Sequence, residues 1–238
     1  MNLIVIPARG GSKGLPNKNL QVLLGKSLIG RAILCAKQVS QPSRIVVTTD
    51  SQEIKREAEV YGAEVPFLRS AHLSDDFSTT EETLRDALEK CEELFNESYK
   101  FVTYFSPSEG FLDPQCVNRG LDMMDRDGTI ESHFPGKYMF KNYWETKNLE
   151  NAHPYVRLRD SMRVYSSRQK KTPIFREDTG RGLVSRPYLW KKGIRIGDRV
   201  HIEGTHDIRA DLDIHDALDL KISEFVIREV GDHDFLKF

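Results

Sequence analysis

A short glycine-rich segment near the amino terminus combines backbone flexibility with positive charge. Residues 6–19 have the sequence IPARGGSKGLPNKN, in which Arg9 and Lys13 flank Gly10 and Gly11, and Gly14 follows. Glycine N–H groups can converge on an anion because no Cβ blocks close approach. Arginine binds phosphate oxygens through paired hydrogen bonds, and lysine adds a point charge. The segment therefore predicts a triphosphate site rather than a site for a lone carboxylate.

Two standard phosphate-binding templates fail on this segment. The dinucleotide fingerprint G-x-G-x-x-G requires a glycine where Arg9 stands. The P-loop pattern matches its end at residues 25–27, but Leu20 replaces its leading glycine. The alternative is a surface loop with chance charges. We disfavour it because the segment follows a buried strand, at the sheet edge where α/β proteins bind ligands.

Two aspartates near the carboxyl terminus form a second candidate constellation. Asp211 and Asp213 are two residues apart, so their side chains share one face if the stretch is extended. Paired carboxylates repel unless a cation lies between them, and Mg²⁺ accepts carboxylate and phosphate oxygens together. The alternative is that one aspartate only caps the helix predicted for residues 214–230.

The elements that position these residues alternate between strands and helices. Apolar runs predict buried parallel strands at residues 3–6, 45–47 and 101–105. Apolar residues at helical spacing predict helices between and after them, at residues 27–39, 51–61, 84–95 and 114–124. The order predicts an α/β fold, a mostly parallel sheet flanked by helices.

Local signals mark where some of these helices begin and end. Asp50 or Ser51 can cap the second helix, which Gly62 ends. Thr79 and Glu82 have the spacing of a capping box. The aromatic and basic stretch at about 129–181 lacks clear periodicity. We expect one domain, residues 1–238, in which this stretch is a dimerisation or substrate extension.

Bulk properties narrow the class of protein. The chain has 238 residues, with 35 Lys and Arg against 36 Asp and Glu, so its net charge is close to zero. This balance does not favour nucleic acid or a membrane surface as a partner. Cys35, Cys91 and Cys116 are too scattered for a disulfide or zinc framework, and buried thiols are expected. The apolar amino-terminal run is too short for a signal peptide or membrane span. We expect a cytoplasmic protein.

The amino-terminal segment closely resembles the signature loop of the sugar-acid cytidylyltransferases, the family of CMP-N-acetylneuraminate synthetase. The resemblance continues through GKSLIGRAI, IVVTTDSQEI and YGAEVPFLRSAHLSDD, and returns in SRQKKTPIFRE and ADLDIHDALDL. It weakens between residues 128 and 165.

The resemblance implies a Rossmann-like nucleotidyltransferase fold, a homodimer and a Mg²⁺-dependent reaction. CTP and an acidic acceptor, a 3-deoxy-2-keto sugar acid, give a CMP-sugar and pyrophosphate. Arg9, Lys13, Asp211 and Asp213 are the implied catalytic residues, the two aspartates as metal ligands. The implied nucleotide-binding residues are Ala8, Arg9, Gly10, Gly11, Ser12, Lys13, Asn19, Thr79, Thr80, Ser106, Pro107 and Ser108. For Asn19, Thr79 and Thr80, a turn or capping role is the alternative.

Two stretches depart from the family pattern. After the third strand the family carries Q-P-T-S-P-x-R, whereas residues 106–112 are SPSEGFL, which introduces Glu109 and places Leu112 where the arginine belongs. The family segment NGAIY is replaced at residues 178–182 by DTGRG. The acceptor therefore remains open. A sialic-acid-like sugar is the main expectation, a phosphonate is an alternative, and a nucleotide-binding regulatory paralogue without activity is another.

Basic residues of the extension are candidates to bind an acidic acceptor, across a dimer interface if necessary. By resemblance the best placed are Arg168 and Gln169; a solvated face is the alternative for each basic residue. Isolated histidines lack metal-ligand spacing, so surface or packing roles are expected for His133, His153 and His215.

Overall fold

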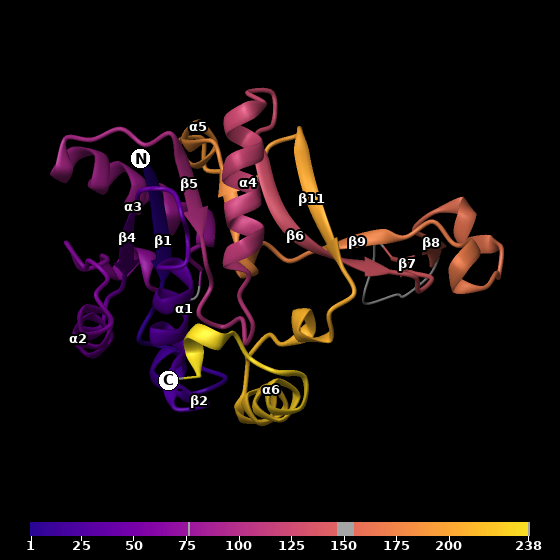
Figure 1. The fold of residues 1–238 in the computed structure, drawn as a ribbon, viewed down its shortest axis with the longest axis horizontal. Coiled ribbons are helices and arrows are strands. Elements are labelled where there is room, and N and C mark those ends of the chain that lie inside the picture. Colours follow the sequence, from indigo (N-terminus) through magenta and orange to yellow (C-terminus); the bar gives the residue numbers. More distant parts are fainter. Residues whose placement is uncertain (76, 147–154, 238) are drawn as a thin grey trace.

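A seven-stranded mixed sheet forms the centre of the molecule (Figure 1), in a computed structural model that describes residues 1–75, 77–146 and 155–237. The strand order is β11-β6-β10-β5-β1-β4, with β9 paired to β6. β1 pairs in parallel with β4 and β5, and β6 with β11, whereas β10 is antiparallel to both of its neighbours. The predicted mostly parallel α/β sheet is confirmed.

The main-sheet strands are β1 (Asn2–Pro7), β4 (Ser43–Thr48), β5 (Phe101–Tyr104), β6 (Ser132–Met139), β9 (Ile174–Glu177), β10 (Leu183–Ser185) and β11 (Val200–Thr205). Short pairs are formed by β2 (Val22–Leu23) with β3 (Lys26–Ser27), and by β7 (Trp144–Glu145) with β8 (Val156–Arg157). The α-helices are α1 (Leu28–Ala36), α2 (Gln52–Val60), α3 (Thr80–Phe95), α4 (Pro114–Arg126), α5 (Pro187–Lys191) and α6 (Ala217–Val230).

Strand β1 shows how the core is divided between the two faces of the sheet. Ile4 and Ile6 pack with apolar side chains of α1, α2 and α4, whereas Leu3 and Val5 pack with those of α3 and α5. Successive side chains of a strand point to opposite faces. A strand covered on both faces is therefore apolar throughout, which explains the uninterrupted run in the sequence.

The predicted caps at the starts of α2 and α3 are confirmed. Ser27, Ser51 and Thr79 each accept a backbone N–H bond at a helix start, and Thr79 and Glu82 complete the capping box. Gly62, with φ +81°, follows α2 as predicted. The last helix starts later than expected, because Asp216 and Asp219 form its capping box and fix its first turn at Ala217.

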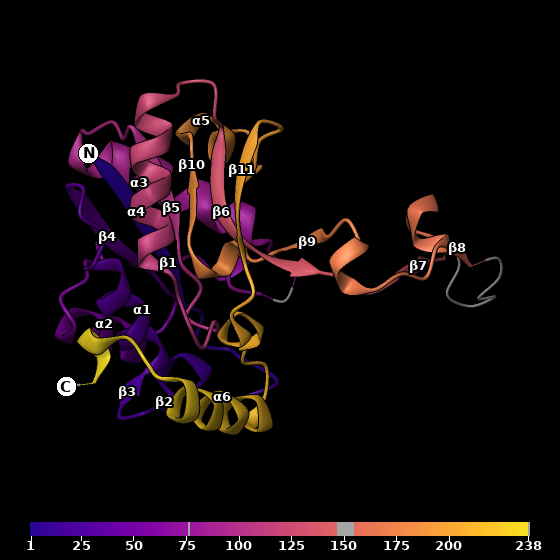
Figure 2. The ribbon, with the colours of Figure 1, turned by 45° about the vertical axis from the view of Figure 1, so that its right-hand side comes forward.

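The predicted extension at 129–181 is too wide. Both β6 and β9, which lie inside that range, pair with each other in the main sheet. The buried start of β6 is polar, Ser132 and His133, so the sequence has no apolar alternation there. The described residues that project are 140–146 and 155–173, here called the arm, with β7 and β8 at its far end (Figure 2).

Among the described residues, no helix is long and apolar enough to cross a membrane.

Candidate active site

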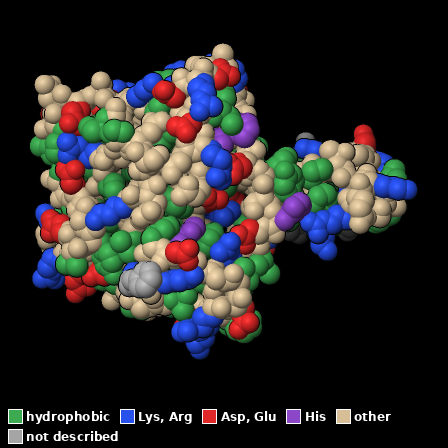
Figure 3. Space-filling model, viewed as in Figure 1, with side chains coloured by type: hydrophobic (Ala, Val, Ile, Leu, Met, Phe, Trp, Pro, Cys, Tyr) green, Lys and Arg blue, Asp and Glu red, His purple; other side chains and the backbone are tan. Residues whose placement is uncertain are grey.

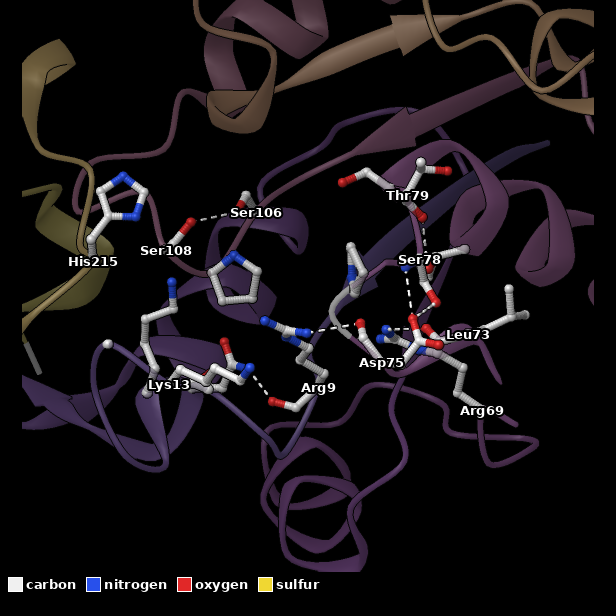
Figure 4. A pocket seen from close by; sticks show the side chains of 18 of the residues that line it. Arg9, Lys13, Arg69, Leu73, Asp75, Ser78, Thr79, Ser106, Ser108 and His215 are labelled. Atoms are coloured by element: carbon white, nitrogen blue, oxygen red, sulfur yellow. Dashed lines mark hydrogen bonds between the residues drawn. The ribbon is translucent and has the colours of Figure 1, made fainter. Parts of the chain in front are cut away.

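A cavity of about 480 Å³ lies beyond the carboxyl ends of β1 and β5. In Figure 4 the side chains of Arg9 and Lys13 point into it between His215 and Ser108 on one side and Ser78 and Thr79 on the other. The predicted residues that line it are Arg9, Ser12, Lys13, Asn19, Thr79, Thr80, Ser106, Pro107 and Ser108. Three remote stretches of the sequence thus meet at one site.

The glycine-rich loop is fixed by hydrogen bonds from outside it. The Gly10 N–H donates to Asp50 Oδ1 at 2.8 Å, and buried Asn19 donates from Nδ2 to the Arg9 carbonyl at 2.9 Å. Ser51 caps α2, so Asp50 is free of the capping role considered for it. Because the Gly10 N–H already donates to Asp50, this amide is not directed at the cavity. The loop therefore acts on the cavity mainly through its charged side chains.

The same loop is held against the segment that carries the aspartates. A Cβ at Gly14 would lie 2.6 Å from the His215 carbonyl oxygen, so only glycine permits this approach. Lys18 Nζ donates to the Ile214 carbonyl at 3.1 Å. Burial lowers the pKa of Lys18, and Arg9 adds to this effect, whereas Asp213 opposes it. The cationic loop and the acidic segment, about 200 residues apart, therefore form one site.

Serine and threonine residues line the first cavity on both of these sides. Ser106 Oγ and Ser108 Oγ share a hydrogen bond of 2.8 Å. The Thr79 hydroxyl accepts from the Glu82 N–H at 3.2 Å, so capping already employs this side chain. The amino-terminal end of α3 faces the cavity at Thr80, which places the positive end of a helix dipole beside it.

A second cavity, of about 350 Å³, adjoins the first and shares Tyr104, Ser106 and Ser108 with it. Its other walls include Asp211, Asp213 and residues 178–180. Glu109 also lines it. Both stretches in which the sequence departs from the family pattern therefore meet in this one cavity.

Asp211 and Asp213, the two predicted metal ligands, both line the second cavity, but they differ in backbone conformation and in ionic partners. The stretch is not extended at Asp211, which ends a 3₁₀ helix. The backbone of Asp213, in contrast, forms an isolated antiparallel β-bridge with Glu109. Asp211 is paired with Lys137, and with Arg176 Nη1 at 2.8 Å. Burial would raise its pKa, but these two cations outweigh burial and hold the pKa below its usual value. Asp213 pairs instead with His215 Nε2 at 2.9 Å.

This donor set fits Mg²⁺ most directly at Asp213. Its carboxylate lies between the second cavity and the Lys18 side of the loop, and carboxylate oxygens are the ligands Mg²⁺ prefers. Asp211 can ligate the same ion only by exchanging Arg176 or Lys137 for it.

Glu109 is the most strongly perturbed carboxyl group of the second cavity. Partial burial raises its pKa to about 8, and the negative charge of Asp213 adds to the shift, while Arg181 opposes it. An acid in such surroundings is protonated at neutral pH unless a cation binds beside it.

Several predicted residues lie outside the two cavities. Ala8, Gly10 and Gly11 belong to the loop but are not among the lining residues. On the arm, Arg168 packs over the Phe140 ring and has Gln169 as its neighbour; it also contacts His206, which follows β11. A single chain therefore does not bring this pair to either cavity. His153 lies outside the described residues.

Some cations of the site were not predicted from the sequence, among them Lys18, Arg69 and Arg176. Lys18 lies inside the loop motif, so its position in the sequence could have identified it. Buried Arg69 lines the first cavity and donates to the carbonyls of Thr48 and Leu73. Arg176 reaches the second cavity from β9. No spacing in the sequence predicts the place of Arg176 in the site, since that place depends on how β9 pairs with β6.

Comparison with known proteins supports a single family. Residues 3–194 match the family described as cytidylyltransferase. The chain is 40% identical over 121 residues to the CMP-N,N'-diacetyllegionaminic acid synthase of Legionella pneumophila, covering 51% of this chain and 52% of the relative. The match thus spans about half the length of that relative. The chain is also 44% identical over 229 residues, 95% of each chain, to the post-translational flagellin modification protein B of Campylobacter coli.

A solved structure shows the same fold. The structure of CMP:2-keto-3-deoxy-manno-octonic acid synthetase complexed with CTP matches with a TM-score of 0.66 at 18% identity, covering 96% of this chain and 99% of the other.

Proposed function

The chain belongs to the cytidylyltransferase family, and from this premise we propose that it transfers CMP from CTP to an acidic sugar, releasing pyrophosphate. The acceptor is a 3-deoxy-2-keto sugar acid of the sialic acid type. Relatives named as CMP-N,N'-diacetyllegionaminic acid synthase and pseudaminic acid cytidylyltransferase support this class of acceptor.

The observation that carries the proposal is the contact between the cationic loop and the acidic segment. Gly14 lies against the His215 backbone, and Lys18 binds the Ile214 carbonyl. A triphosphate in the first cavity therefore meets Arg9 and Lys13 at one end and the aspartates of the second cavity at the other. This arrangement suits a reaction at the α-phosphorus between the cavities.

In this reaction a hydroxyl oxygen of the acceptor attacks the α-phosphorus in line. The new P–O bond forms as the bond to pyrophosphate breaks, and the hydroxyl proton leaves to solvent. Lys13 and Arg9 stabilise the charge that builds up on the leaving pyrophosphate. Ser106 and Ser108, shared by both cavities, are placed to orient the reacting groups.

We assign the second cavity to the acceptor. It adjoins the first, and both departures from the family pattern line it, as expected if the nucleotide site is kept while the acceptor differs. Arg176 and Arg195 supply positive charge to this cavity.

Asp213, with Asp211 after it exchanges a cationic partner, would hold Mg²⁺. When bound, this ion would offset phosphate charge. Without it, Asp213 would repel an acidic acceptor, since its carboxylate lines the acceptor cavity.

We further propose a cytoplasmic homodimer. Such a dimer would give Arg168 and Gln169 of one arm a place in the acceptor cavity of the partner, since they do not line the cavity of their own chain. The three buried free thiols fit a reducing compartment.

Pyrophosphate release tests the proposed function. The full chain with Mg²⁺ is offered each common nucleoside triphosphate together with a panel of acceptors: legionaminate, pseudaminate and sialate derivatives, 3-deoxy-manno-octulosonate and simple phosphonates. We expect release with CTP that depends on a sugar acid.

Two other outcomes support different functions. Release with phosphonates alone would assign the chain to CMP transfer onto that class. CTP binding without turnover on any acceptor would make it a nucleotide-binding regulatory protein and overturn the proposal.

A further inference from the structure

Three potential metal ligands converge under helix α4, away from both cavities. Cys116 of α4, His133 of β6 and Glu203 of β11 place their ligand atoms within 4.8 Å of one another. The side chains of Cys116 and His133 are fully buried, and that of Glu203 is 31% exposed. None of the three lines the first or the second cavity. The proposed CMP transfer therefore leaves this cluster unexplained.

The distances within the cluster suit one tetrahedral ion. Cys116 Sγ lies 3.3 Å from His133 Nε2, and Glu203 Oε2 lies 3.7 Å from the same nitrogen. Ideal zinc bond lengths place sulfur and nitrogen ligands roughly 3.5 Å apart, and nitrogen and oxygen ligands roughly 3.3 Å apart. Small side-chain adjustments are enough to accommodate the ion.

Neighbouring groups orient two of the ligands. His201 Nδ1 lies 3.0 Å from His133 Nδ1, and the two rings stack with their centroids 5.0 Å apart. If His133 Nδ1 donates its hydrogen to His201, the lone pair of Nε2 faces Cys116. Arg119 Nε donates to Glu203 Oε2 at 2.9 Å and fixes the carboxylate.

We propose that Cys116, His133 and Glu203 form a site for a divalent ion of borderline softness, with Zn²⁺ as the best match, and with water as its fourth ligand on the exposed side of Glu203. A thiolate with an imidazole selects zinc or cobalt over magnesium and calcium. Binding replaces the thiol hydrogen: the S–H proton leaves to solvent and a sulfur–metal bond forms. The ion joins α4 to β6 and β11, and so has a structural role separate from CMP transfer.

Cobalt provides a direct probe, because a thiolate bound to Co²⁺ gives a charge-transfer band in the near ultraviolet. The full chain, stripped with a chelator, is titrated with Co²⁺ alone. We expect a band that saturates at one equivalent per chain and disappears when Zn²⁺ is added. Cys116→Ser should abolish the band, whereas Cys91→Ser, a buried thiol of α3, should keep it.

Two further variants protect the test against loss of folding. Glu203→Gln changes a partly exposed ligand, and Arg119→Gln removes only the group that orients it; the latter should weaken Co²⁺ binding by about tenfold or more. A folded wild-type protein without the band would overturn the site and leave a simple S–H···N hydrogen bond between Cys116 and His133. A band that persists in Cys116→Ser would overturn it as well. Neither result bears on CMP transfer, because no residue of this cluster lines its cavities.

Discussion

Lys13 and Lys18 have different tasks although they lie five residues apart in one loop. The Lys18 amine is bound to the Ile214 carbonyl, and burial lowers its pKa, so it connects two segments of the chain. Lys13 lines the first cavity beside Arg9, from the opposite side to Thr79 (Figure 4). We therefore assign the charge-stabilising role to Lys13 and a positioning role to Lys18.

Replacing Lys13 tests this assignment. Lys13→Ala should lower the turnover number about a hundredfold or more, because it removes a charge that stabilises the leaving pyrophosphate. Pyrophosphate release at saturating CTP and acceptor measures the effect. Lys55→Ala, on the outer side of α2 in an ion pair with Glu59, is the control and should keep normal turnover. Near-normal turnover in Lys13→Ala would remove Lys13 from the mechanism.

Glu109 predicts an unusual dependence of stability on pH. Its pKa is about 8 in the folded protein and about 4.5 in the unfolded chain. Between these values the unfolded chain releases the proton and the folded protein keeps it. The contribution of Glu109 to the free energy of unfolding is thus complete below 4.5 and declines as pH rises to about 8.

This decline is measured by urea unfolding in the presence of a chelator. The unfolding is repeated at several pH values between roughly 5 and 9. Glu109→Gln keeps a neutral side chain at every pH, so its stability should fall less over that range than that of the wild type. Parallel pH profiles of the two proteins would contradict the prediction.

At the scale of elements, the sequence predicts what local chemistry decides. Caps at Ser51 and Thr79 and the apolar run of β1 are local signals, and the structure confirms them. Strand β6 escaped prediction because its buried start is polar: Ser132 shares a hydrogen bond with Ser185 across the sheet, and His133 packs under α4. Asp50 and Arg176 likewise act through pairings that only the folded sheet creates.

The packing of α4 on β6 depends on the absence of a side chain at Gly120. A Cβ there would lie 2.4 Å from His133 Cδ2, and Cys116 and His201 hold that ring in place. Gly120→Ala should therefore lower the free energy of unfolding by about 1–3 kcal/mol, even though alanine favours helices by about 1 kcal/mol.

Denaturant unfolding of the chelator-treated protein measures this change. Gly128→Ala is the control, because a Cβ at Gly128 has no atom within 4 Å. That control should stay within about 0.5 kcal/mol of the wild type. An unchanged or raised stability of Gly120→Ala would show that His133 can move away from α4.

At the scale of the whole molecule, the most distinctive feature is the arm. Figure 3 shows it extending from the body, with apolar and basic side chains on the visible face. Exposed apolar side chains of the arm include Trp144, Tyr155, Val156, Leu158, Val164 and Tyr165. A monomer rarely exposes so many apolar groups on one projection. We therefore expect a second copy of the chain to cover the apolar side chains of the arm.

Charged substitutions on the arm test this arrangement. Val164 and Tyr165 are 67% and 76% exposed, so the double change of both to Glu should leave the body folded while it repels a partner chain. Light scattering after gel filtration should find a dimer for the wild type and a monomer for this variant. Val60→Glu changes an even more exposed apolar residue, on α2, and this control should remain dimeric.

The monomeric variant also tests whether one arm completes the acceptor site of its partner. Because Arg168 lies outside both cavities of its own chain, loss of the dimer should raise KM for the acceptor about tenfold or more, as expected when a cationic hydrogen bond to the acceptor is lost. CTP affinity should stay the same, since Arg9 and Lys13 remain in place. An equal loss in both affinities would instead mean that the partner chain supports the whole active site, and unchanged kinetics in a monomer would remove the arm from catalysis.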